Sequence, residues 1–145
     1  MSGTATTVNV LAILPSPEDR TSLTRIFGHS HWTLHFADCL DRACALIEGL
    51  GVGVVISDCT LPDACWQDVL QELQHQPAGP PLIVAARLAD DRLWAEVLNL
   101  GGYDVLSTPF DTSEVVRSVS LAWRFWHERS AGKVMRAGSQ GHAPF

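Results

Sequence analysis

A single carboxylate stands at the end of an apolar run in the stretch VVISDCTLPDA, residues 54–64. The run ends in Ser57 and Asp58, and a turn signal follows at Leu61-Pro62-Asp63. An acid at the mouth of a buried strand is either a reactive group or a structural remnant. The residues that end the neighbouring strands must decide between these two interpretations.

Other residue types that bind metals or act as nucleophiles form no recognisable arrangement. The four cysteines have no CxxC spacing of the zinc type, and we expect them to be small buried side chains. Three histidines cluster around the second predicted strand, where solvated loop positions are favoured over a metal site because a site needs converging ligands. These residues are Cys39, Cys44, Cys59 and Cys65, and His29, His31 and His35. Since the spacing gives no Ser-His-Asp or Cys-His arrangement, we predict that the protein is not an enzyme.

The glycine-rich segment GLGVG, residues 49–53, precedes a predicted strand. The dinucleotide-binding fingerprint follows a strand and opens a helix, so a helix stop and loop is the better interpretation. A flavodoxin-type enzyme needs a glycine- and hydroxyl-rich phosphate loop after the first strand, and PSPED at residues 15–19 has no glycine. We therefore expect no flavin or nucleotide cofactor.

Composition limits the class of protein further. The chain has 145 residues, of which 46% are hydrophobic and 18% charged, so it can bury the core of one ordinary domain. A net charge of -6 disfavours binding to a nucleic-acid backbone. No apolar run approaches the roughly 20 residues that cross a bilayer, and the first residues lack signal-peptide features. We expect a cytoplasmic protein with neither nucleic acid nor membrane as its partner.

Apolar segments of two kinds alternate along the chain. Short apolar runs predict five strands, and segments with helical spacing between helix start and stop signals predict five helices. The expected strands are 8–14, 32–37, 52–57, 82–86 and 103–107, and the expected helices are 17–27, 38–50, 64–76, 90–100 and 111–129. Continuous apolar strands joined by helices predict a parallel sheet covered on both faces, which is an α/β domain.

The ends of these strands are the predicted site. In parallel α/β sheets, ligands and chemistry lie at the carboxyl ends of the strands, at the topological switch point. The residues there are Leu14 to Ser16, Asp58, Ala85 to Arg87 and Thr108.

Three motifs in these positions resemble the receiver domain of bacterial two-component response regulators, over residues 8–128. They are VVISDCTLPD, PPLIVAAR and GGYDVLSTPFD. The resemblance implies a five-stranded, doubly wound (βα)5 flavodoxin-like fold with strand order 2-1-3-4-5. It also implies that Asp58 occupies the phosphoacceptor position, and that the Thr108-Pro109 peptide bond is cis.

The resemblance further implies auxiliary groups that this chain lacks. The family holds Mg²⁺ with an acidic pair after the first strand, where this chain has Leu14 and Pro15, followed by Ser16. The family hydroxyl after the fourth strand and the lysine after the fifth are replaced by Ala85 and Thr108. We therefore expect a degenerate pocket from which Mg²⁺ is lost.

Two further departures concern signalling and metal binding. The aromatic switch residue that the family carries on the fifth strand is Val105 here, which cannot make the aromatic rotamer change. Glu18 and Asp19 lie in the first turn of the following helix, where pairing with the helix dipole is favoured over a role as substitute metal ligands.

The chain has five tryptophans, and three of them lie on the last two predicted helices. Trp123 and Trp126 are three residues apart and therefore neighbours on one helical face, which either packs on the sheet or forms an exposed aromatic patch. In receivers, the fourth helix, fifth strand and fifth helix often form a dimer or partner surface. The candidate interaction face is therefore Trp94, Val105, Trp123 and Trp126.

Two functions follow from the resemblance and its departures. The first is an atypical stand-alone receiver, residues 8–129 with a flexible polar tail at 130–145, that acts in phosphorelay signalling as a phosphorylation-independent interaction module. Its partner would be a histidine kinase, another regulator or a second copy. The second is a working phosphoacceptor whose Asp58 takes phosphate from a kinase or phosphotransfer protein, with the chemistry supplied by the partner.

Overall fold

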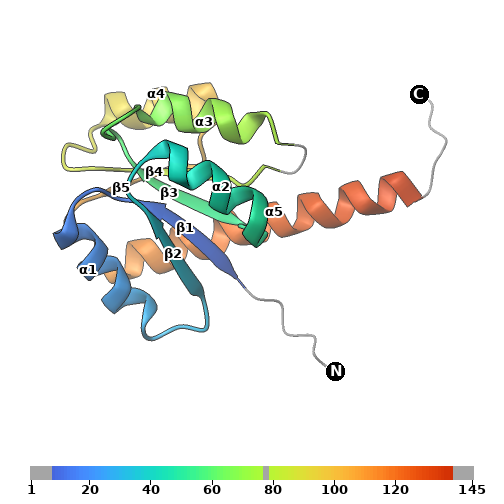
Figure 1. The fold of residues 1–145 in the computed structure, drawn as a ribbon, viewed down its shortest axis with the longest axis horizontal. Coiled ribbons are helices and arrows are strands. Elements are labelled where there is room, and N and C mark those ends of the chain that lie inside the picture. Colours follow the sequence, from blue (N-terminus) through green and yellow to red (C-terminus); the bar gives the residue numbers. More distant parts are fainter. Residues whose placement is uncertain (1–7, 77–78, 139–145) are drawn as a thin grey trace.

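The structure is a computed structural model that describes residues 8–76 and 79–138, with side chains up to residue 130. Five parallel strands form one sheet in the order β2-β1-β3-β4-β5 (Figure 1), which confirms the predicted topology. The strands are β1 Asn9–Ile13, β2 Thr33–Ala37, β3 Val54–Asp58, β4 Leu82–Ala86 and β5 Asp104–Ser107. The helices are α1 Pro17–Phe27, α2 Leu40–Leu50, α3 Trp66–Gln74, α4 Asp91–Leu100 and α5 Thr112–Gly138.

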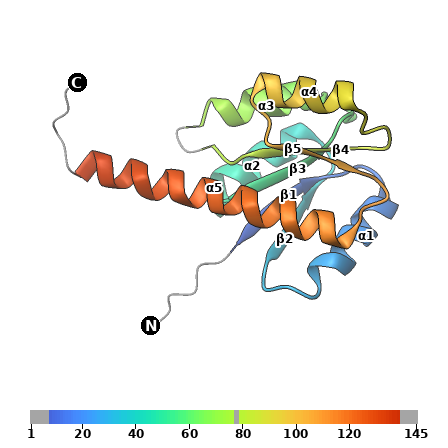
Figure 2. The same cartoon turned by 180° about the vertical axis from the view of Figure 1, so that it is seen from behind.

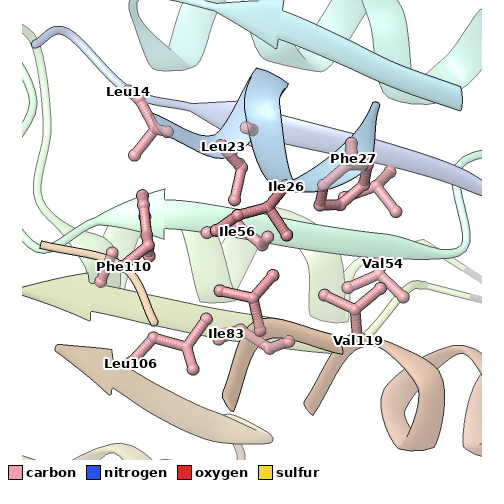
Figure 3. Close-up of a cluster of buried hydrophobic side chains, with 14 of the residues drawn as sticks. Leu14, Leu23, Ile26, Phe27, Val54, Ile56, Ile83, Leu106, Phe110 and Val119 are labelled. Carbon is pink, nitrogen blue, oxygen red and sulfur yellow. The ribbon is translucent and has the colours of Figure 1, made fainter. Parts of the chain in front are cut away.

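Helices cover both faces of the sheet, with α1 and α5 on one face and α2, α3 and α4 on the other (Figures 1 and 2). Residues of β1 alternate between the two layers: Val10 and Ala12 pack with α1 and α5, whereas Leu11 and Ile13 pack with the other helices. Figure 3 shows the first of these two cores, in which Leu23 of α1 lies among the buried side chains. Burial on both faces explains why the strands are almost continuously apolar.

Local signals set where the helices begin and end, and the predicted start of the first helix at residue 17 is confirmed. Ser16 has an extended backbone and its Oγ accepts a hydrogen bond from the Asp19 amide at 3.5 Å, while Pro17 takes the first helical position. Gly51 and Gly101 end α2 and α4 with φ of +62° and +110°, a region that favours glycine. The Thr108-Pro109 peptide bond is cis, as the resemblance implies.

The element boundaries differ from the prediction most at the C-terminal end. Helix α5 continues to Gly138 and extends past the edge of the sheet (Figure 2), whereas the sequence predicts its end near Arg129. Residues 130–138, SAGKVMRAG, are rich in good helix formers, so this segment is part of a helix and not a separate polar tail. The rest of the predicted tail, residues 139–145, lies outside the described residues.

Candidate functional site

The carboxyl ends of the strands enclose one pocket, as the parallel topology predicts. The cavity has a volume of about 590 Å³ and opens at the edge of the sheet. We call it the strand-end pocket; the lining residues used below are Pro15, Asp19, Asp58, Arg87, Leu88, Leu93 and Thr108. It lies at the switch point between β1 and β3, where the direction of strand succession reverses.

Asp58 is the last residue of β3 and is only partly buried. Its Oδ1 accepts one hydrogen bond, from the Thr60 amide at 3.4 Å, which is long for a charged acceptor. The carboxylate therefore faces the pocket with most of its hydrogen-bonding capacity unused by the described residues.

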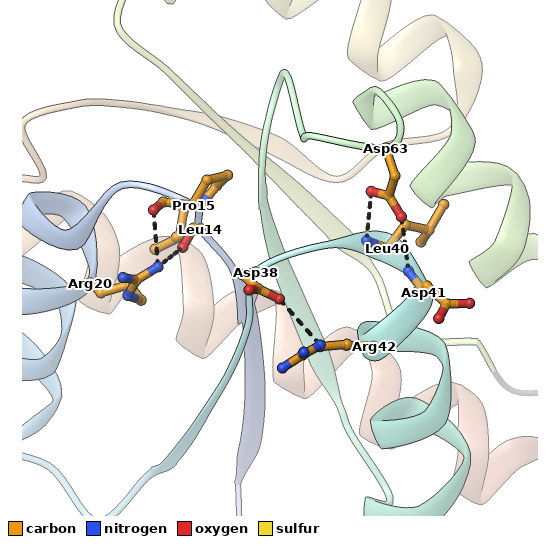
Figure 4. Close-up of polar contacts among 8 residues, drawn as sticks. All are labelled: Leu14, Pro15, Arg20, Asp38, Leu40, Asp41, Arg42 and Asp63. Atoms are coloured by element: carbon orange, nitrogen blue, oxygen red, sulfur yellow. Dashed lines mark hydrogen bonds and ion pairs between the residues drawn. The ribbon is translucent and has the colours of Figure 1, made fainter.

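The end of β1 contributes no acidic side chain to the pocket. Leu14 is fully buried in the core shared with α1 and α5, where Phe110 belongs to the same cluster (Figure 3). Two backbone carbonyls at this strand end are bound by Arg20. Its Nη1 donates to the Leu14 carbonyl at 2.7 Å and to the Pro15 carbonyl at 3.0 Å (Figure 4). A guanidinium group thus holds the loop between β1 and α1.

The ends of β4 and β5 are equally poor in catalytic groups. Ala85 is buried and packs in the core, so Ala86 and not Ala85 lines the pocket. Thr108 does line the pocket, but it is buried and carries no charge. The structure therefore leaves Leu14 and Ala85 in the core and brings the other predicted residues together at the pocket, namely Pro15, Ser16, Asp58 and Thr108.

Asp19 is a pocket residue whose role the sequence interpretation missed. It lies in the first turn of α1, yet it is only 9% exposed and lines the pocket with Asp58. Burial raises the pKa of the Asp19 carboxyl; the charge of Arg87 opposes this, while Asp58 and Glu18 raise it further. The sequence spacing does indicate burial of Asp19, because residue 19 precedes the buried Leu23 by one helical turn and therefore lies on the same face of α1.

The loop that follows Asp58 is tied to a different helix by Asp63. Its Oδ1 accepts from the Leu40 amide at 3.0 Å and its Oδ2 from the Asp41 amide at 3.2 Å (Figure 4). These backbone hydrogen bonds, the Leu40 bond first, lower the pKa of the Asp63 carboxyl. Asp63 therefore caps the start of α2 from 22 or more residues away in the chain.

The strand-end pocket offers few side-chain oxygens to a metal ion. Its carboxylates are Asp19 and Asp58, and within the described residues no three His, Cys, Asp or Glu side chains are placed to share a metal. Mg²⁺ requires near-octahedral oxygen coordination, and Leu14 and Pro15 supply no side-chain ligand. Arg87 lines the same pocket, and its charge opposes the rise in the pKa of the Asp19 carboxyl.

The four residues of the predicted interaction face do not lie together. Trp94 is 50% exposed and lines a shallow cleft of about 430 Å³ with Val105 and Arg117. Trp123 and Trp126 instead pack against Gly53, the residue before β3: a Cβ there would lie 2.9 Å and 3.0 Å from their ring carbons. These two tryptophans therefore pack on the sheet, one of the two alternatives that their spacing left open.

Other apolar side chains of α5 are exposed where the sequence did not single them out. Leu121 and Phe125 lie one helical turn apart on the outer surface. Phe125 contacts the Tyr103 ring at a centroid distance of 5.6 Å, and the Arg129 guanidinium lies 5.2 Å from the Phe125 ring centre. The exposed stripe therefore runs along the side of α5 that borders β5.

Five parallel strands in this order, with an aspartate at the switch point, define a doubly wound α/β domain of the receiver type. Comparison with known families agrees, since the family model described as the response regulator receiver domain matches residues 10–120. The chain belongs to the response regulator receiver domain family.

Known relatives share this domain but are longer. A Mycobacterium tuberculosis protein named "Probable transcriptional regulatory protein TcrX" is 30% identical over 111 residues, which cover 75% of this chain and 47% of the relative. The three curated relatives that match are covered over 15%, 47% and 51% of their own length, so this chain spans about half of them or less.

Solved structures show the same fold. The signal receiver domain of an HD domain-containing protein from Pseudomonas fluorescens Pf-5 is similar with a TM-score of 0.76 and 25% identity, covering 85% of this chain and 99% of that one. The chemotaxis response regulator CheY4 of Vibrio cholerae is similar with a TM-score of 0.72 and 18% identity, covering 81% and 99%.

The chain is therefore a receiver domain of two-component signalling, a class of module that acts through contact with kinases or other regulators. Within residues 8–76 and 79–138, no helix combines the length and the apolar character that crossing a bilayer requires.

Proposed function

We propose that this receiver domain signals through protein contacts that do not depend on phosphorylation of Asp58. The buried apolar end of β1 carries the proposal: Leu14 is fully buried, and Arg20 binds the carbonyls beside it. The position that holds metal-binding acids in the family is thus filled by core packing and an internal cation.

The chemistry of phosphoryl transfer supports the same conclusion. Attack of a carboxylate oxygen on a phosphoryl group spreads negative charge over the transition state, which positioned cations and donors stabilise. Thr108 brings no charge to the pocket and Ala85 brings no hydroxyl. Loss of a single stabilising donor costs about 10²–10³ in rate, and loss of several costs more, although the effects need not add.

The loops around the pocket are held without a metal ion. Arg20 binds the loop after β1, and Asp63 binds the loop after β3 to the start of α2. Val105 in place of an aromatic residue removes the rotamer change by which the family reports phosphorylation. These features support a module that keeps one conformation.

Asp58 itself favours the alternative function, a working phosphoacceptor. It is partly exposed and faces an open pocket, so a partner could reach it. In that case a kinase or phosphotransfer protein would have to supply the cations that this chain lacks.

A mass measurement distinguishes the two functions. The full chain is incubated with Mg²⁺ and a small phosphodonor such as acetyl phosphate, and separately with a phosphorylated phosphotransfer protein. We expect an unchanged intact mass in both. A gain of one phosphate would overturn the proposal if Asp58→Asn abolishes it and the exposed control Asp41→Asn retains it. If this gain occurs only with the phosphorylated phosphotransfer protein, the alternative function is established.

The contact surface of this module is proposed to be the side formed by α4, β5 and α5, with a second copy of the chain as the partner. Trp94 and Val105 line its cleft, and α5 adds the exposed apolar side chains Leu121 and Phe125. Sedimentation at high concentration should detect a dimer that Trp94→Ser and Leu121→Ser weaken. A wild-type chain that stays monomeric would refute self-association.

A further inference from the structure

One side of α5 carries exposed charged and apolar side chains, and we call it the exposed side of α5. Glu114, Leu121, Phe125 and Arg129 follow one another at intervals of seven, four and four residues, which places them along one side of a helix. All four are exposed, Leu121 by 45% and Phe125 by 44%. Figure 2 shows α5 in front of the sheet, with no other described helix over it. Among the described side chains, the charged groups of α5 form no ion pair.

The charges of α5 are ordered so that the two ends of the helix complement each other. Glu114 and Arg117 lie seven and four residues before Leu121, and Glu128 and Arg129 lie seven and eight residues after it. A two-fold axis beside Leu121 that reverses the helix direction sets Arg129 of a second copy opposite Glu114, and Glu128 of that copy near Arg117. At a rise of about 1.5 Å per residue, the members of each pair come within about 3 Å of the same level along the helix.

A parallel arrangement of two α5 helices gives the opposite result. Each residue then faces its own counterpart, so that Glu114 meets Glu114 and Arg129 meets Arg129, and like charges repel. The neighbouring charges act in the same direction as those on the exposed side. They are Asp90 and Asp91 at the cleft beside the start of α5, and Lys133 and Arg136 near the end of the helix. The charge distribution therefore favours antiparallel pairing of two copies.

The apolar side chains between the charged ends supply surface that such pairing buries. Leu121 lies beside the axis, and Phe125 follows one turn later with the Arg129 guanidinium 5.2 Å from its ring centre. Aromatic and arginine side chains are enriched at interface hot spots, while charges at the rim fix orientation. A two-fold dimer uses the same surface on both copies, so it requires a self-complementary surface such as this one.

We propose that two copies of the chain associate through the exposed sides of their α5 helices, which lie antiparallel around a two-fold axis beside Leu121. Glu114 of each copy pairs with Arg129 of the other. The second half of each α5 lies across the start of the other, beside the cleft that Trp94 lines. This inference rests on the proposed function, because it gives the arrangement of the self-association proposed there.

Charge reversals test this arrangement by sedimentation equilibrium of the full chain. Glu114→Arg and Arg129→Glu should each raise the dimer dissociation constant by about tenfold, because each replaces two attractive pairs per dimer with two repulsive ones. The double variant Glu114→Arg/Arg129→Glu restores opposite charges and should associate like the wild-type chain. An equimolar mixture of the two single variants should also recover the dimer, which shows that both variants are folded.

Matched controls separate this pairing from a change in net charge. Glu48→Arg and Arg25→Glu make the same charge changes at exposed positions of α2 and α1. They should leave the dimer dissociation constant close to that of the wild-type chain, since neither residue belongs to the exposed side of α5.

The possible failures are distinguishable. A dimer that neither single reversal weakens, or that the mixture of single variants does not recover, would overturn the antiparallel arrangement and leave self-association standing. A wild-type chain that stays monomeric would overturn both. Phosphorylation of Asp58 by the small phosphodonor would overturn phosphorylation-independent signalling, whatever the arrangement of the dimer.

Discussion

The packing of two tryptophans on Gly53 gives a prediction whose sign and size follow from the structure. A Cβ at residue 53 would lie 2.9 Å from a ring carbon of Trp123 and 3.0 Å from one of Trp126, well inside the 3.5–4.0 Å of a favourable carbon contact. Overpacking of this kind costs about 1–3 kcal/mol. Alanine recovers about 0.4–1 kcal/mol by restricting the unfolded chain.

Gly53→Ala should therefore lower the free energy of unfolding by about 1.3 kcal/mol, the difference between the midpoints of these two ranges. The matched control is Gly49→Ala, because that glycine lies inside α2 and an added Cβ would meet nothing within 4 Å. The control should raise the free energy of unfolding by about 0.5–1 kcal/mol, the usual gain of alanine over glycine in a helix.

Urea unfolding followed by circular dichroism measures both changes. In a double-mutant cycle, Trp123→Leu should reduce the cost of Gly53→Ala, since the ring that the methyl group meets is gone. If Gly53→Ala is neutral or stabilising, the tryptophans do not pack on this residue, and an exposed aromatic face on α5 becomes the better interpretation.

Three further predictions concern the residues around the pocket. Leu14→Asp should lower the free energy of unfolding by about 3–5 kcal/mol in urea titrations, because it removes a buried leucine and buries a carboxyl group. An unchanged urea midpoint of unfolding would contradict the burial of Leu14 in the core. Asp19→Asn should stabilise the chain increasingly as the pH rises from about 4 through the raised folded-state pKa of Asp19, because the charged form of that carboxyl is disfavoured in the folded chain. A stability difference that does not depend on pH would contradict this. Asp63→Ala should lower the stability by a constant amount above about pH 5, and this loss should shrink as the pH falls through the lowered folded-state pKa of Asp63. Thermal unfolding at several pH values measures the loss, and a loss that persists at the lowest pH would contradict the capping role.

The fold was predictable because its signals are local. Continuous apolar runs identified the five strands, and helix start and stop signals identified the first helix at residues 17–27, which the structure confirms. The end of α5 was not predicted correctly, because the polar and glycine-rich composition after Arg129 indicates a tail, whereas the helix formers in SAGKVMRAG continue the helix.

The pocket was predictable in position and only partly in composition. Parallel topology brings Asp58 and Thr108 to one edge whatever their side chains are. Asp19 was missed because its place in the first helical turn offered a sufficient local role, although its spacing from Leu23 indicated burial. The reach of Arg20 to two carbonyls depends on the loop conformation, which residue types alone do not determine.

Contacts between distant segments were the least accessible from the sequence. The bond between Asp63 and the start of α2 joins two loops that no motif relates. The side of α5 that meets Gly53 depends on how the helix lies on the sheet, so the spacing of Trp123 and Trp126 showed that they are neighbours but not what they contact.

The most direct test of phosphorylation-independent signalling is a titration of the labelled chain with Mg²⁺ and beryllofluoride, a stable mimic of the phosphoryl group. The amide resonances of Asp58, Thr60 and Thr108 report the pocket. We predict no saturable shift at these residues, because Leu14, Ala85 and Thr108 remove the groups that would hold the metal and the phosphoryl oxygens. Saturable shifts that need both reagents and disappear in Asp58→Asn would contradict the proposed function.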